Sequence, residues 1–92
     1  MQRDGPEAKP LLIFPTPFPI KVMGRREEGF AQAILEVVLR HAPDFDPATM
    51  EMRPSKAGTY LSLTITIEAQ SREQLDAIYQ ELSSHPLVLM AL

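Results

Sequence analysis

The strict alternation of apolar and polar side chains in residues 60–69 is the feature that most constrains the fold of this chain. Successive side chains of a β-strand point to opposite faces, so this pattern buries one face and leaves the other to solvent. The segment therefore predicts a strand in a sheet that is covered on one side only. The apolar face consists of Leu61, Leu63, Ile65, Ile67 and Ala69, and the other face of Tyr60, Ser62, Thr64, Thr66 and Glu68.

Two segments have the apolar spacing of amphipathic helices. The first covers residues 28–41, where Arg40 and His41 suit the negative end of the helix dipole and Pro43 ends the helix. The second follows Ser71, which forms a capping box with Gln74, whose side chain is expected to reach back to the Ser71 amide. The core-facing stripes are Phe30, Ala33, Ile34, Val37, Val38 and His41 in the first, and Leu75, Ile78, Tyr79 and Leu82 in the second.

Three further segments predict strands. Residues 18–24 alternate between apolar and other side chains, and the prolines at 15, 17 and 19 exclude a helix and keep the chain extended. Residues 50–54 form a weaker strand, whose Pro54 favours a sheet edge. A hairpin turn at residues 55–58 joins it to the alternating strand, and the apolar residues 87–92 predict a final strand.

The element order is strand, helix, strand, strand, helix, strand. Right-handed crossovers then favour an α+β, ferredoxin-like βαββαβ sandwich, a four-stranded antiparallel sheet with both helices on one face. Residues 18–92 are expected to form this single domain, and residues 1–17 a flexible leader and proline-rich arm. The apolar residues 11–14 either fold back onto the domain or dock on a partner.

Composition excludes several classes of function. The chain has 92 residues, a net charge of −3 and no cysteine, which argues against thiolate metal sites, a thiol nucleophile and general binding of polyanions. His41 and His85 lack neighbours at metal-ligand spacing, so no metal or cofactor is expected. Apart from Tyr60, the open faces of the predicted strands lack the aromatic residues that RNA-binding domains of similar topology use for stacking. The sequence contains no catalytic nucleophile motif, no glycine-rich phosphate-binding loop and no membrane-spanning segment. A soluble, cytoplasmic protein without enzymatic activity is therefore expected.

One candidate site is the loop Gly24, Arg25 and Arg26 between the first strand and the first helix. A glycine and two arginines at a helix N-terminus can hold a small anionic metabolite through amide and guanidinium groups. The alternative is a solvated loop in which the arginines pair with Glu27 and Glu28, acidic residues suited to a helix start.

A second candidate is an interaction surface for a protein partner or for self-association. It consists of a polar patch on neighbouring strands and their hairpin, together with an apolar ridge on the first helix that lies off its main stripe. The alternative for the patch is the ordinary solvated side of a half-covered sheet. The patch residues are Lys21, Arg53, Ser55, Lys56 and Tyr60, and the ridge residues are Leu35 and Leu39.

Three stretches together resemble the YbeD-like family of small bacterial proteins of unassigned function: FPTPFPIKVMG (14–24), RHAP (40–43) and PSKAGTYLSLTITI (54–67). That family is similar in fold to the ACT regulatory domains of amino-acid metabolism. The resemblance implies a cytosolic, non-catalytic, regulatory module, and it carries over no ligand or catalytic residue. Many ACT domains bind an effector where the first strand meets the first helix through an Asp-x-Pro-Gly-like turn, which residues 24–27 lack. We therefore expect a regulatory or protein-interaction module, with a metabolite- or anion-sensing domain as the alternative.

Overall fold

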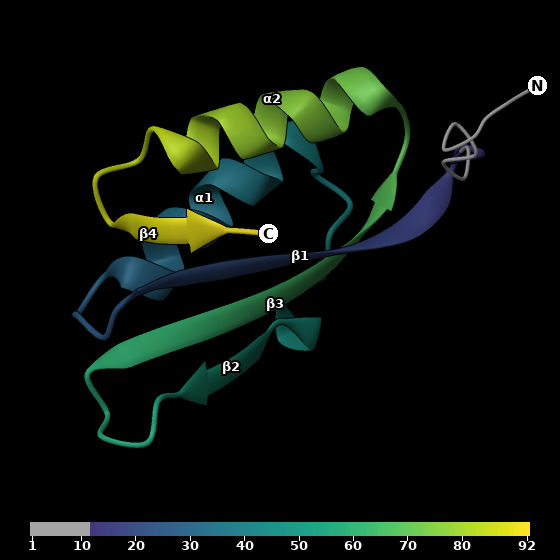
Figure 1. Cartoon of the computed structure of the whole chain (residues 1–92). Helices are drawn as coiled ribbons and strands as arrows, with labels where there is room; N and C mark the ends of the chain where they lie inside the picture. The colour runs from purple at the N-terminus through teal and green to yellow at the C-terminus, as the bar shows by residue number, and fades with distance from the viewer. Residues whose placement is uncertain (1–11) are drawn as a thin grey trace, which may run out of the picture.

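The computed structural model describes residues 12–92, so the predicted leader and Leu11 lie outside the described residues. Within this range the chain forms four strands, two α-helices and one short 3-10 helix (Figure 1). The elements are β1 (Thr16–Arg25), α1 (Phe30–His41), η2 (Pro47–Thr49), β2 (Glu51–Pro54), β3 (Tyr60–Ala69), α2 (Arg72–Ser83) and β4 (Val88–Ala91).

The strands form one antiparallel sheet in the order β2-β3-β1-β4, with both helices on the same side (Figure 1). The predicted α+β, ferredoxin-like sandwich is confirmed, with the first and third strands in the centre. On β3 the apolar residues Leu63 and Ile65 are fully buried under the helices, as the alternation predicts. Among residues 12–92 no α-helix covers the opposite side of the sheet, which we call the open face.

β1 begins at Thr16, two residues before the predicted start, and contains Pro17 and Pro19. Lys21 exchanges two backbone hydrogen bonds with Leu92, which shows that alternate β1 residues point their backbone groups toward β4. Pro17 and Pro19 therefore also point their backbone groups toward the β4 side of β1. β4 pairs with β1 only near the C-terminal end of β1, so nothing in β4 lies opposite the two prolines. The missing proline amides therefore remove no hydrogen bond from the ladder between β1 and β3.

α1 begins at Phe30, so the prediction that it starts at residue 28 was wrong. Gly29 is the N-cap residue and has a φ of 90°, a left-handed conformation that glycine adopts readily and that cannot continue a helix. Glu27 and Glu28 consequently precede the helix, and its first turn contains no acidic residue.

The start of α2 uses the predicted cap with one difference. The Ser71 hydroxyl accepts a hydrogen bond from the Gln74 amide at 3.1 Å. The Gln74 side chain accepts from the amide of Gln70 at 2.7 Å rather than from that of Ser71. Its amide group also donates to the backbone oxygen of His41 at 2.8 Å, which ties the start of α2 to the end of α1.

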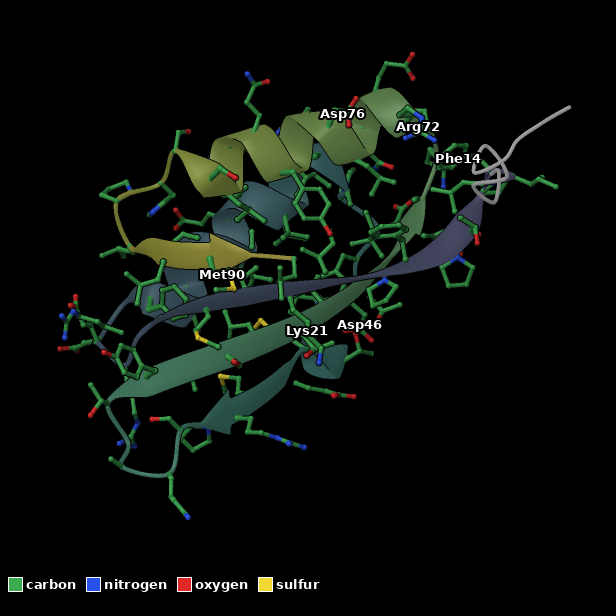
Figure 2. All side chains as sticks on the ribbon, in the orientation of Figure 1. Phe14, Lys21, Asp46, Arg72, Asp76 and Met90 are labelled. Atoms are coloured by element: carbon green, nitrogen blue, oxygen red, sulfur yellow. The ribbon has the colours of Figure 1, made fainter. Side chains whose placement is uncertain are left out.

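The core lies between the sheet and the helices. Leu12 and Phe14 pack against it, so this part of the apolar arm folds back onto its own domain, whereas Ile13 is 82% exposed. Figure 2 labels Phe14, which precedes β1, and Arg72, the first residue of α2. The core residues are Ile20, Val22, Phe30, Ile34, Val37, Val38, Ala42, Phe45, Leu63, Ile65, Ile67, Ala69, Leu75, Ile78 and Leu82.

Candidate functional site

The predicted anion loop has a structural reason for its glycine. A Cβ atom on Gly24 would lie 2.5 Å from the backbone oxygen of Leu87 and 2.5 Å from the ring of Phe30. Both contacts are closer than real Cβ atoms tolerate, so glycine lets β1 approach α1 and the start of β4. Gly24 itself is buried and does not face solvent.

The amide groups of this loop are largely used within the protein. The Arg26 amide donates to the Thr59 oxygen at 2.8 Å, and the Glu27 amide to the Arg25 oxygen at 2.8 Å. The Phe30 amide donates to the Glu27 oxygen at 3.2 Å. The guanidinium groups of Arg25 and Arg26 are the charged donors that remain for an anion. Within residues 12–92 no ion pair joins them to Glu27 or Glu28, the predicted alternative.

The structure brings the predicted loop and part of the predicted polar patch together. Arg25 lies over the ring of Tyr60, with its guanidinium carbon 6.0 Å from the ring centroid. The Arg26 side chain approaches Gly58 in the hairpin between β2 and β3. Ser55 has a structural role there, because its hydroxyl accepts from the Tyr60 amide at 3.1 Å and its amide donates to the Tyr60 oxygen.

Cationic side chains gather on this half of the open face. Lys21, Arg25 and Arg53 are exposed and lie opposite Thr64, Tyr60 and Ser62 on β3, respectively. Lys56 extends the cluster at the hairpin, and Glu51 is an acidic neighbour on β2. Of the other lysine and arginine residues that the structure describes, Arg26 lies in the loop after β1, and Arg40 and Arg72 belong to the helices. We call Lys21, Arg25, Arg53 and Lys56 the basic cluster.

Beside the basic cluster lies an exposed apolar surface that we call the methionine patch: Met23, Met90 and Leu92. These side chains are 38%, 48% and 68% exposed. Met23 lies opposite Met90, and Leu92 pairs with Lys21, so all share the open face. Lys21 and Met90 are labelled in Figure 2. They line a shallow cavity of about 230 Å³ together with Lys21 and Ser62. The sequence indicated an apolar last strand but not its position beside Met23.

The predicted apolar ridge is less exposed than its helical position suggests. Leu35 and Leu39 are half-buried and pack against the core. Nearby, Glu81 on α2 links the two helices by accepting from Arg40 and by contacting the His41 ring nitrogen Nε2 at 2.8 Å. His41 is therefore a packed, hydrogen-bonded residue, as its place at the end of the first helix predicts.

Tyr79 on α2 holds the C-terminal end of the chain, just after β4, against the helix layer. The Tyr79 hydroxyl donates to the backbone oxygen of Leu92 at 2.8 Å, and its ring meets the edge of Phe18 with 6.5 Å between centroids. Burial raises the pKa of Tyr79 above its usual value. This contact supports the methionine patch from the helix side.

A larger cavity of about 720 Å³ lies at the opposite end of the sheet. Its walls come from the segment after α1, the end of β3 and the starts of β1 and α2, and include Asp44, Phe45 and Glu68. No motif in the sequence indicated it, because its walls come from segments that lie far apart in the sequence. Within residues 12–92 there is no group of His, Cys, Asp and Glu side chains arranged to hold a metal ion. No helix in that part of the chain is long and apolar enough to cross a membrane.

Comparison with known proteins supports the family that the three sequence stretches suggested. A UPF0250 protein of Leptothrix cholodnii is 54% identical over 90 residues, which cover 98% of this chain and 99% of the relative. A UPF0250 protein of Bordetella pertussis is 54% identical over 87 residues, 95% of this chain and 96% of the relative. The solution structure of protein HP0495 from H. pylori shares the fold, with a TM-score of 0.78, 18% identity and coverage of 100% of this chain and 97% of that one. Residues 9–92 match DUF493, described as a protein of unknown function. The chain belongs to this family, whose members include small bacterial proteins of unassigned function.

Proposed function

We propose that this chain is a non-enzymatic interaction module that binds a partner protein through the open face of its sheet. The observation that carries the proposal is the methionine patch, an uncovered apolar surface with a small cavity at its centre. Exposed contiguous apolar surface on a small domain is typical of an interaction site. Methionine side chains are flexible and polarisable, and they adapt to the surface of a partner.

The neighbouring charges define the chemistry of that partner. Lys21 borders the cavity, and Arg25 and Arg53 lie on the same face. Opposite charges across an interface speed association and fix the register of the two surfaces. The proposed partner therefore presents an apolar side chain for the cavity and acidic residues for the basic cluster. Such a partner fits a regulatory role, because binding needs no chemistry within this chain.

Affinity co-purification from cells that encode the protein tests the proposal, with the tagged wild-type chain compared with two methionine variants. Met90→Lys places a charge in the patch, whereas Met52→Lys is a matched control on β2, where Met52 is 57% exposed and Met90 is 48% exposed. Met52 lies opposite Leu63 and therefore on the other side of the sheet. Substitution of a residue at the centre of an interface should weaken binding about tenfold or more.

The proposal predicts one defined protein that is recovered with the wild-type chain and with Met52→Lys and is lost with Met90→Lys. Lys21→Glu should lower its recovery, and so should added salt, because the charges are at the surface. Equal recovery with both methionine variants, or recovery of no defined protein, contradicts the proposal. Sedimentation velocity of the pure protein shows whether the partner is a second copy.

The second candidate function is the sensing of a small anionic metabolite at Gly24, Arg25 and Arg26. The observation that favours it is the meeting of Arg25 and Arg26 with the hairpin that carries Lys56. It has less support than the open face, because the Arg26 and Glu27 amides are already hydrogen-bonded within the protein. A thermal-shift series with phosphate, citrate and pyruvate tests it. Stabilisation that disappears in Arg25→Gln/Arg26→Gln supports this function, and the absence of any shift contradicts it.

A further inference from the structure

β3 extends beyond the end of its neighbour β2 and leaves a strand position empty. β2 pairs with residues 61–64 of β3. In this register Arg53 lies opposite Ser62, and Glu51 lies opposite Thr64. The next pair in this register would join Thr66 to Thr49. Thr49 instead belongs to η2, which follows an N-cap in which the Asp46 side chain accepts from the Ala48 amide at 3.0 Å.

The backbone of β3 presents its hydrogen-bonding groups toward that position. Tyr60 accepts from the Ser55 amide, which shows that even-numbered residues of β3 point their backbone groups toward β2. Thr66 and Glu68 have the same phase. No residue of β2 lies opposite Thr66, so the ladder with β2 ends before its amide and carbonyl. The Glu68 carbonyl accepts from the Gln70 side chain at 3.2 Å.

The 720 Å³ cavity occupies the same place. Thr49 and Thr66 both line it, and Phe45 and Pro17 contribute apolar surface. Asp44, Asp46 and Glu68 also line it, and within residues 12–92 none of these carboxylates takes part in an ion pair. A free strand edge, apolar surface and negative charge therefore meet in one cavity.

We propose that this cavity binds an extended, basic peptide segment of a partner protein, which adds to β3 as a short strand in the position that η2 leaves empty. Main-chain hydrogen bonds to Thr66 provide the pairing, and alternate side chains of the peptide enter the cavity. A lysine or arginine of the peptide faces Asp44 and Glu68. This site is separate from the methionine patch, so it stands or falls independently of the function proposed above.

A nuclear magnetic resonance titration of the full chain tests the proposal. The probe is the peptide acetyl-Val-Lys-Val-Lys-Val-amide, and its matched control has glutamate in place of lysine. We expect the lysine peptide to shift the amide signals of residues 44–49 and 66–70 and to slow hydrogen exchange of the Thr66 amide. No binding of the lysine peptide, equal binding of both peptides, or shifts confined to the open face near Met90 would overturn the proposal.

Two sets of variants separate the charged and backbone contributions. Asp44→Asn/Glu68→Gln should weaken binding of the lysine peptide by roughly three- to tenfold, whereas Glu51→Gln, on the exposed part of β2, should leave it unchanged. Thr66→Pro removes the free amide without removing a bond to β1 and should abolish binding, whereas Thr66→Val should retain it. If Thr66→Pro does not fold, a peptide with N-methylated backbone amides replaces it, and undiminished binding of that peptide contradicts strand addition.

Discussion

At the scale of single residues, Gly24 has a packing role rather than the anion-binding role that its neighbours suggested. Beside Arg25 and Arg26 it resembled part of an anion-binding loop. In the structure it is buried, and the space for its missing side chain is taken by the Phe30 ring and the Leu87 backbone. Packing between β1, α1 and the start of β4 therefore explains the glycine.

Gly24→Ala should destabilise the protein, because the added methyl group would meet a backbone oxygen that cannot rotate away. Overpacking of this kind costs about 1–3 kcal/mol. Urea unfolding followed by circular dichroism measures the loss. Lys21→Ala, an exposed change on the same strand, serves as the control and should lie within about 0.5 kcal/mol of the wild-type value. Equal stability of Gly24→Ala and the wild-type chain would contradict the packing role.

Tyr79 should make the stability of the protein fall at high pH. Its pKa is raised by burial, so the folded state favours the neutral phenol, and its contribution is fully present below the unfolded pKa of 10.0. That contribution is lost as the pH rises through the higher folded pKa. Tyr79→Phe cannot ionise, so the stability advantage of the wild-type chain should shrink as the pH rises above 10.0. Thermal unfolding of both proteins across this range measures it, and a constant difference contradicts the assignment.

At the scale of elements, local patterns predicted what depends on local geometry. Strict alternation predicted β3, and Ser71 with Gln74 predicted the start of α2. The start of α1 was misplaced because the acidic residues suggested a first turn, whereas the left-handed Gly29 sets the boundary. β1 can extend to Thr16 because the positions of Pro17 and Pro19 that lack an amide hydrogen face away from β3. The sequence did not predict this, because it depends on which neighbouring strand lies on each side of β1.

Ser71→Ala should remove the N-cap of α2 and cost about 1 kcal/mol of stability. Ser84→Ala is the matched control at the other end of the helix. The Ser84 hydroxyl only bonds back to the Gln80 and Glu81 carbonyls, at 3.0 and 3.2 Å, so its loss should have a smaller effect. Chemical unfolding of both variants compares them, and an equal or larger loss in Ser84→Ala would show that the cap contributes little.

At the scale of the whole molecule, the surfaces depend on contacts that the sequence alone does not contain. The open face was predictable because β3 alternates and both crossovers place their helices on one side. The methionine patch joins Met23 on β1 to Met90 on β4, and the empty strand position depends on where η2 turns away from β3. Both arise from registers between distant segments, so the sequence indicated the uncovered side of the sheet but not its binding features.

Site-specific photo-crosslinking in living cells tests the central claim, that the methionine patch binds a protein partner, most directly. A photoreactive amino acid is placed at position 90 in one version of the chain and at position 52 in another. We predict one defined crosslinked product from position 90, absent from position 52 and reduced by Lys21→Glu. No product from position 90, or the same product from both positions, would contradict the account.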